Sequence, residues 1–125
     1  MSKQILKRSA TTNSSRRTDT KRSARLFAAL GDETRLQLLS RLGAGAPQSI
    51  KQLTVDLPIT RQAVTKHLRI LEEADFVTQQ SRGRERLFAA RRAGLDEAQA
   101  ALKVIAQQWG DALQRLKNFV ESNSL

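Results

Sequence analysis

Cysteine is absent from the 125-residue sequence, and this absence removes three kinds of chemistry. The chain can form no disulfide, no thiolate metal site and no cysteine nucleophile, and the lack of cysteine also fits a reducing compartment. No apolar run approaches the roughly 18 residues that a membrane-spanning helix needs, so no membrane partner is expected. Aromatic residues make up only 4% of the chain, which favours a small helical domain over a large β-sandwich.

The positive charge is unevenly distributed along the chain. The formal net charge is +10; residues 1–25 hold eight Lys or Arg and one acid, Asp19, whereas the remainder holds 14 basic and 11 acidic residues. A high overall charge therefore says little about whether the folded part binds nucleic acid. Residues 1–20 are polar, rich in Ser and Thr and without apolar periodicity, which predicts a disordered basic tail. This tail is either an arm that holds DNA or an extension of little consequence.

The stretch that starts at Thr60 carries the strongest pattern in the sequence. Thr60 is well suited to cap the N-terminus of a helix, and Val64, Leu68 and Leu71 then recur at i, i+4 and i+7, which predicts one apolar stripe. The other face carries side chains that can reach base edges and phosphates: Arg61, Gln62, Thr65, Lys66 and Arg69. On this stretch alone, an ordinary amphipathic helix with a solvated charged face remains the alternative.

A short helix from Ser49 to about Val55 is predicted immediately upstream. Ser49 followed three residues later by Gln52 is a capping-box signature, and Ile50 and Leu53 are expected to point inward. A helix, a tight turn and a second helix with a basic polar face form the pattern of a helix-turn-helix.

Two further helices are predicted before this pair. The first runs from Lys21 to about Ala29 and is ended by Gly31, and Asp32 then caps a second helix, which the Gly- and Pro-containing loop at 43–47 terminates. The apolar residues expected to pack inward are Leu26, Phe27 and Leu30 in the first helix and Leu36, Leu39 and Leu42 in the second.

After the Thr60 helix the period of the sequence changes to one typical of strands. Phe76–Ser81 and Glu85–Ala90 predict two strands joined by a turn that contains glycine, so a β-hairpin, or wing, follows the helix. Its tip carries Arg82 and Arg84, with Arg86 close by. Like charges so close together repel, which suggests that an external polyanion neutralises them.

The last segment, from Leu95 to about Val120, predicts a long helix. Its apolar residues follow alternating steps of three and four, as in a heptad seam. A single domain of this size rarely covers so long a stripe, so pairing with a second copy, alongside the first helix, is the favoured solution; a helix folded back on its own core is the alternative. The expected dimer interface is Leu26, Phe27, Leu102, Ile105, Trp109, Leu113, Leu116 and Val120.

Together these motifs resemble the ArsR/SmtB family of bacterial transcriptional repressors. The resemblance rests on Leu26–Leu36, the Thr60–Leu71 helix and Gly83–Arg86, and covers about residues 21–121. It implies a winged helix-turn-helix domain over residues 21–125. The implied fold is mainly α with a small β-hairpin, in the order α-α-α-α-β-β-α, and its long C-terminal helix serves dimerisation. It also implies a cytoplasmic, nucleoid-associated homodimer that represses by occupying a pseudo-palindromic operator on double-stranded DNA until an effector loosens it.

The sequence departs from the metal-sensing members of that family. Such members carry cysteines in the helix before the second helix of the motif, where this chain has Leu53–Leu57, or histidines on the last helix, where it has none. His67 is the only histidine, and its place in the family pattern implies packing or a phosphate contact. A lone histidine cannot supply a zinc site. A non-metal-sensing member without a cofactor is therefore expected, resembling a subgroup with Trp109 in the last helix and no obvious effector site.

The expected DNA contacts divide into those that read bases and those that hold phosphates. Arg61 and Gln62 are the first choices for base contact, because arginine binds guanine and glutamine binds adenine bidentately; Thr65 and Lys66 come next. The complete expected DNA-binding set is Ser49, Thr60, Arg61, Gln62, Thr65, Lys66, Arg69, Arg82 and Arg84.

Two functions besides a sequence-specific regulator remain open on the sequence. One is a non-specific architectural DNA binder, which the basic tail would suit, and the other is a winged helix that binds another protein. An enzyme is not expected, because the sequence shows no Gly-rich phosphate loop, no Ser/His/Asp arrangement and no carboxylate pair beside a base.

Overall fold

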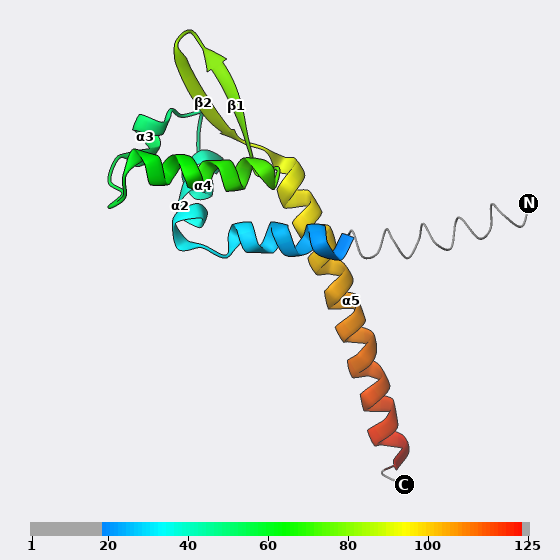
Figure 1. Cartoon of the computed structure of the whole chain (residues 1–125). Helices are drawn as coiled ribbons and strands as arrows, with labels where there is room; N and C mark the ends of the chain where they lie inside the picture. Colours follow the sequence, from blue (N-terminus) through cyan, green and yellow to red (C-terminus); the bar gives the residue numbers. More distant parts are fainter. Residues whose placement is uncertain (1–18, 124–125) are drawn as a thin grey trace, which may run out of the picture.

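The computed structural model describes residues 19–123 and is mostly helical (Figure 1). Residues 19–30 form an N-terminal helix. It is followed by α2 (Glu33–Gly43), α3 (Ile50–Thr54), α4 (Arg61–Glu73), β1 (Val77–Arg82), β2 (Glu85–Ala90) and α5 (Arg92–Asn123). The predicted order of four helices, a β-hairpin and a long last helix is confirmed. Asp19 and Thr20, which the sequence placed in the tail, are helical, and the rest of that tail lies outside the described residues.

Side-chain caps begin three of the helices at the residues that the sequence indicated. The Asp32 carboxylate accepts a hydrogen bond from the backbone N–H of Arg35 at 3.0 Å. Ser49 and Gln52 form a reciprocal capping box, and Thr60 Oγ1 accepts from the backbone N–H of Ala63 at 3.1 Å. Because a cap depends only on neighbouring residues, these boundaries could be predicted locally.

The hydrophobic core is formed by the buried faces of α4 and of the helices packed around it. The stripe predicted for α4 is confirmed, since Val64, Leu68 and Leu71 are fully buried. The stripe predicted for α2 is wrong at one position: Leu36 is 50% exposed, and Leu38 is buried instead. Leu38 and Leu42 are one helical turn apart and share the inner face, whereas Leu36, two residues before Leu38, lies on nearly the opposite side of the helix.

The β-hairpin forms the wing-like projection beside α4 (Figure 1). β1 and β2 pair antiparallel from Val77 opposite Ala90 to Arg82 opposite Glu85, and Gly83 in the connecting turn has φ +66°, a conformation that favours glycine. An interaction that the sequence did not predict joins Gln48 to Phe88 through two backbone hydrogen bonds of 2.9 and 2.7 Å. This bridge fixes the hairpin against the segment that leads into α3.

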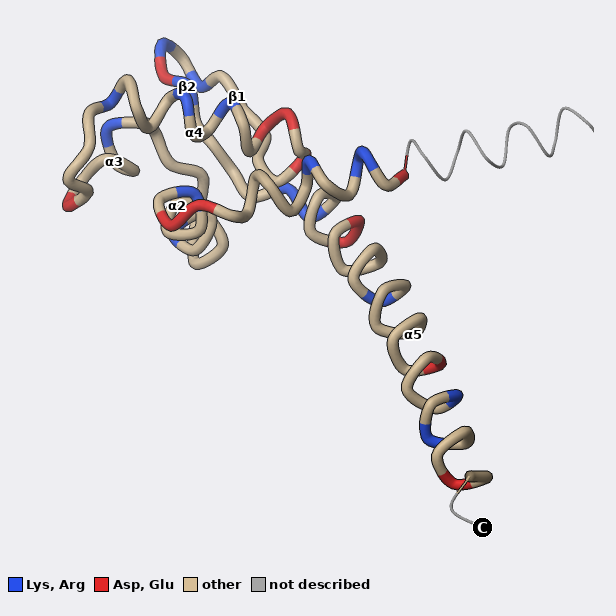
Figure 2. Tube along the Cα trace, turned by 60° about the horizontal axis from the view of Figure 1, so that its bottom comes forward, with Lys and Arg blue, Asp and Glu red and all other residues tan. Residues whose placement is uncertain are grey.

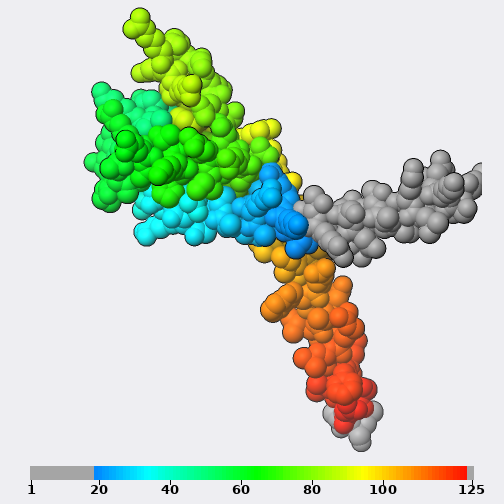
Figure 3. Space-filling view, viewed as in Figure 1, coloured from blue at the N-terminus to red at the C-terminus, as the bar shows by residue number. Residues whose placement is uncertain are grey.

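α5 leaves the rest of the fold and extends beyond it as a single helix (Figures 1 and 3). Its first turn is fastened to the corner that follows α4, because the backbone N–H of Gly94 donates to the carbonyl of Asp75 at 2.8 Å. The described part of the chain, 19–123, contains no helix that is long and apolar enough to span a bilayer.

Candidate nucleic-acid interface

The polar face of α4 is exposed and has no partners within the protein. Arg61, Gln62, Lys66 and Arg69 are all exposed, and their side chains make no hydrogen bond or ion pair among residues 19–123. Gln62, Lys66 and Arg69 lie at i, i+4 and i+7 on the side opposite the buried stripe. Arg61 is exposed because it is in the first turn of the helix. These four predicted contact residues are therefore exposed and unused within residues 19–123, and their contact with DNA stays a prediction.

Three of the predicted contact residues instead use their hydroxyl groups to shape the helices. The hydroxyls of Ser49 and Thr60 accept the capping hydrogen bonds of α3 and α4. Thr65, which is only partly exposed, donates its hydroxyl proton to the Arg61 carbonyl at 2.8 Å. Because these groups are already hydrogen-bonded, they are poorer candidates for reading bases than the four partnerless side chains of α4.

The inner side of α4 is held by a small polar cluster at the start of α2. An N–H of the Arg35 guanidinium lies 3.2 Å from Nδ1 of His67, and the Asp32 carboxylate lies 3.7 Å from the same nitrogen. Arg35 also donates to the carbonyls of Ala29 and Ala28 at 2.7 and 3.1 Å, at the end of the N-terminal helix. The backbone hydrogen bond from Arg35 is the main cause that lowers the pKa of Asp32. His67 thus links α4 to α2, which supports the packing interpretation of this residue.

The register of the hairpin places two of its arginines, Arg82 and Arg86, on different faces. Arg82 stands opposite Glu85, whereas Arg86 stands opposite Ser81. Neighbouring pairs of an antiparallel ladder face opposite sides, so Arg82 and Arg86 lie on different faces. Arg82 and Arg86 therefore do not share a face, and an acid stands across from Arg82; neutralisation of the hairpin arginines by an external polyanion stays a prediction. All three arginines of the hairpin, including Arg84, are nevertheless exposed, and Figure 2 shows basic residues at its tip.

A second ionic cluster fastens α5 to the far end of α4. Arg22 of the N-terminal helix contacts Asp75 at 2.7 Å and Glu97 of α5 at 2.9 Å. The hydrogen bond to Glu97 is the largest cause that raises the pKa of Arg22. Arg91 pairs with the other oxygen of Asp75 at 3.0 Å. The orientation of α5 is therefore set by the same corner that ends α4.

Most residues of the predicted dimer surface are exposed in the protomer, with one correction. The α5 seam is exposed along its whole length, with Trp109 68% exposed, and Phe27 is partly buried. Leu26 is 0% exposed and belongs to the core of the protomer, so it has no surface left for a partner. The sequence could not separate these roles, because Leu26 and Phe27 both lie in the same apolar cluster. The exposed seam is Leu102, Ile105, Trp109, Leu113, Leu116 and Val120.

Two basic residues outside the predicted set share the properties of that set. Lys51 of α3 and Arg86 of β2 are exposed and have no partner within residues 19–123. Lys51 lies two residues from the buried Leu53, on the outer side of its short helix. This spacing in the sequence could have identified Lys51 as an exposed basic residue. No group of three or more metal-ligating side chains comes together in the described part of the chain.

Comparison with known proteins decides what kind of protein carries this surface. A helix-turn-helix domain family matches residues 30–80. The HTH-type transcriptional regulator Rv2034 of Mycobacterium tuberculosis is 33% identical over 99 residues, which cover 78% of this chain and 88% of that protein. The solved structure of an ArsR-like transcriptional regulator from Rhodococcus sp. RHA1 is 37% identical, covers 80% of this chain and 93% of its own, and superposes with a TM-score of 0.72. The chain belongs to the ArsR family.

Membership of the family assigns a role to each element of this ArsR-family regulator. α3 and α4 are its helix-turn-helix, and the β-hairpin is its wing. A homodimeric winged helix-turn-helix DNA-binding domain from Mycobacterium bovis shares the fold at 22% identity and a TM-score of 0.55, covering 74% of this chain and 85% of its own. The resemblance inferred from Leu26–Leu36, the Thr60 helix and Gly83–Arg86 is confirmed, whereas the non-metal-sensing subgroup stays a prediction.

Proposed function

We propose that this ArsR-family regulator is a dimeric repressor that binds a pseudo-palindromic operator by inserting α4 into the major groove. The observation that carries the proposal is the polar face of α4, whose four long side chains are exposed and lack any partner within residues 19–123. Within residues 19–123 these side chains make no hydrogen bond or ion pair that stabilises the fold, whereas a major groove offers them base edges and phosphates.

Arg61 and Gln62 are the residues that we assign to base contact. They occupy the first turn of α4, directly after the Thr60 cap, and the N-terminal residues of such a helix are the ones that meet base edges. Lys66 follows one turn later. Arg69 and the additional Lys51 are assigned to phosphates, where charge matters more than exact direction. Ser49 is assigned there as well, because its hydroxyl accepts the capping hydrogen bond and can still donate its proton.

The wing is assigned to the DNA backbone or the minor groove. Arg82 and Arg84 are exposed at the end of a hairpin that two hydrogen bonds between Gln48 and Phe88 hold in place. A fixed hairpin with cations at its tip can reach phosphates beyond the groove that α4 occupies. Arg86, on the opposite face from Arg82, is the third candidate.

Dimerisation is assigned to the exposed seam of α5 together with the outer side of the N-terminal helix. An apolar stripe of this length, centred on a Trp109 that is 68% exposed, is unusual on a protomer that stays alone in water. The homodimeric domain from Mycobacterium bovis, which shares this fold, supports the proposal of a dimer. Two-fold symmetry would present two α4 helices to half-sites one helical turn, about 34–36 Å, apart.

We also propose that operator release needs no metal in this protein. The residues that metal-sensing relatives would use are replaced at Leu53–Leu57, and the last helix contains no histidine. The proposal predicts that operator affinity is the same with added zinc and with a chelator.

Binding to the DNA upstream of the protein's own gene tests the proposed function. Fluorescence anisotropy with that DNA and with a random duplex, at one salt concentration, is expected to show clear preference for the former. Arg61→Ala should cost about 1–3 kcal/mol and relax the preference at one base pair, whereas Lys103→Ala on α5 removes the same charge without effect. Equal affinity for both duplexes would indicate an architectural binder, and no binding at micromolar protein would indicate a protein-interaction domain; either result contradicts the proposal.

A further inference from the structure

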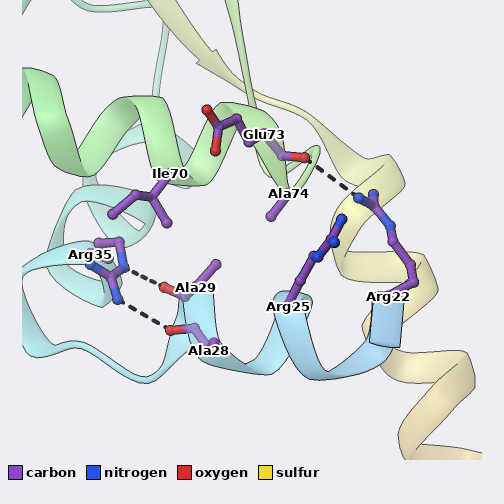
Figure 4. A pocket seen from close by; sticks show the side chains of 8 residues that line it. All are labelled: Arg22, Arg25, Ala28, Ala29, Arg35, Ile70, Glu73 and Ala74. Atoms are coloured by element: carbon purple, nitrogen blue, oxygen red, sulfur yellow. Dashed lines mark hydrogen bonds between the residues drawn. The ribbon is translucent and has the colours of Figure 1, made fainter. Parts of the chain in front are cut away.

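A groove separates the N-terminal helix from the C-terminal half of α4, where Ile70 and Glu73 border the polar face of that helix. It has a volume of about 440 Å³, within the range of roughly 300–1,000 Å³ that is typical of small-molecule sites. We call it the interhelical groove. Its lining residues are Arg22, Arg25, Ala28, Ala29, Arg35, Ile70, Glu73 and Ala74 (Figure 4).

The middle of the interhelical groove is apolar and unfilled. Ile70 of α4 is 40% exposed there, although it is a large aliphatic residue beside the hydrophobic core. Ala28 and Ala29 of the N-terminal helix and Ala74 face the same space (Figure 4). Side chains this small leave room for an apolar ligand group, whose burial against Ile70 would be favourable.

The charge of the groove is positive and incompletely neutralised. Three of the lining residues are arginines and one is an acid. Arg22 is already paired with Asp75 and Glu97, and Arg35 is occupied by the Ala28 and Ala29 carbonyls. Arg25 is exposed and makes no hydrogen bond or ion pair among residues 19–123, and its side chain reaches from the N-terminal helix toward the end of α4 (Figure 4).

We propose that the interhelical groove binds a small amphipathic carboxylate, with the carboxylate on Arg25 and the aliphatic part against Ile70. An arginine without a partner at the end of an apolar trough matches such a ligand, because charge-assisted hydrogen bonds to carboxylates are strong and directional. A DNA phosphate would not use the aliphatic surface. The protein's own first 18 residues contain basic side chains and no acid, so they are repelled by the same charge.

The position of the groove predicts that a bound ligand regulates operator binding; this inference rests on the proposed function. The groove lies between the N-terminal helix, which we assign to the dimer, and α4, which we assign to the operator. A ligand seated in the groove contacts both helices and fixes their relative position, which changes how α4 meets its half-site. By linkage, the ligand and the operator then weaken each other's binding by the same factor.

Calorimetric titration of the full chain with octanoate, below the concentration at which octanoate forms micelles, tests the site without DNA. We expect saturable binding of one octanoate per chain and no comparable binding of acetate or of neutral 1-octanol. Arg25→Gln should weaken octanoate binding by roughly tenfold or more, and Ala28→Leu should abolish it by filling the groove. Lys21→Gln removes a charge one turn away in the same helix and should leave it unchanged.

The outcomes separate the site from the proposed function. Equal octanoate affinity of wild type and Arg25→Gln, equally tight binding of 1-octanol, or no saturable binding would each overturn the groove as a carboxylate site. In the second arm, octanoate should lower operator affinity for wild type and Lys21→Gln but not for Arg25→Gln; an operator affinity that octanoate leaves unchanged overturns the regulatory role. A failure to bind operator when octanoate is absent counts instead against the proposed repressor.

Discussion

At the scale of single residues, the structure distinguishes side chains that build the fold from those left free to bind. Thr60 caps α4 and Thr65 lies on it; both were predicted to contact DNA, but their hydroxyls form hydrogen bonds with the backbone of the helix. Arg61 and Gln62 have no such use within residues 19–123. Composition and spacing could identify the polar face, but they could not show which of its members are already hydrogen-bonded.

Asp32 gives a prediction about acid stability. The hydrogen bond from the Arg35 backbone N–H holds the pKa of Asp32 below its ordinary value. Its contribution to folding is therefore complete above the pKa of the unfolded chain, and it is lost as the pH falls through the lower pKa of the folded state. Asp32→Asn keeps a capping side chain but does not titrate. We expect the stability difference between wild type and this variant to shrink between about pH 6 and about pH 3, measured by urea unfolding; a difference that is constant with pH contradicts the assignment.

At the scale of elements, what could be predicted from the sequence was local. The caps at Asp32, Ser49 and Thr60 and the stripe of α4 depend on residues within a turn of one another. The inner face of α2 and the Gln48–Phe88 bridge depend on neighbours that are distant in the sequence. No periodicity can show that Leu38 packs inward while Leu36 does not, because both choices give a plausible apolar stripe.

The wing gives a prediction about salt dependence. If Arg82 and Arg84 contact phosphates, replacing either by alanine releases fewer counterions on binding. The slope of log affinity against log salt should then fall by about 0.9 for each lost contact, and affinity should drop similarly for operator and random DNA. Anisotropy titrations at several salt concentrations measure the slope. Gln79→Ala, on the same hairpin but uncharged, should keep it, and an unaltered slope in the arginine variants would remove the wing from the interface.

The junction between α4 and α5 gives a prediction about stability. A Cβ atom at Gly94 would lie 2.6 Å from the Ala74 carbonyl oxygen and 2.7 Å from that of Asp75, which are backbone atoms with little freedom to move. Gly94→Ala should therefore destabilise the fold by about 1–3 kcal/mol, despite the better helix propensity of alanine. Gly110→Ala in the same helix meets nothing within 4 Å and should stabilise it by up to about 1 kcal/mol. Denaturant unfolding compares the two, and equal stabilities would show that the junction is loose.

At the scale of the whole molecule, the ionic corner around Asp75 connects the parts that are assigned to different tasks. Arg22 from the N-terminal helix, Asp75 after α4 and Glu97 of α5 are joined by contacts of 2.7 and 2.9 Å. The direction of the projecting α5 is thereby tied to the end of α4. In a dimer built on α5, this connection would set the separation of the two α4 helices, which is the geometric quantity that an operator selects.

Trp109 gives the prediction for assembly. A tryptophan that becomes fully buried between two copies contributes about 3–5 kcal/mol relative to alanine. Trp109→Ala should therefore produce monomers at concentrations where the wild type is dimeric, and it should lose operator affinity as a consequence. Gln107→Ala, on the opposite side of α5, is the matched control. Sedimentation equilibrium decides the matter, and a Trp109→Ala protein that remains dimeric would show that the seam lies elsewhere.

The central claim, that α4 reads the major groove, is tested most directly by dimethyl sulfate footprinting of the upstream DNA. This reagent methylates guanine N7 in the major groove and adenine N3 in the minor groove. The wild type should protect guanine N7 in two successive major grooves about one helical turn apart, and the Arg61→Ala, Gln62→Ala double variant should lose this protection. Protection of adenine N3 alone, or identical N7 protection by the double variant, would contradict the claim.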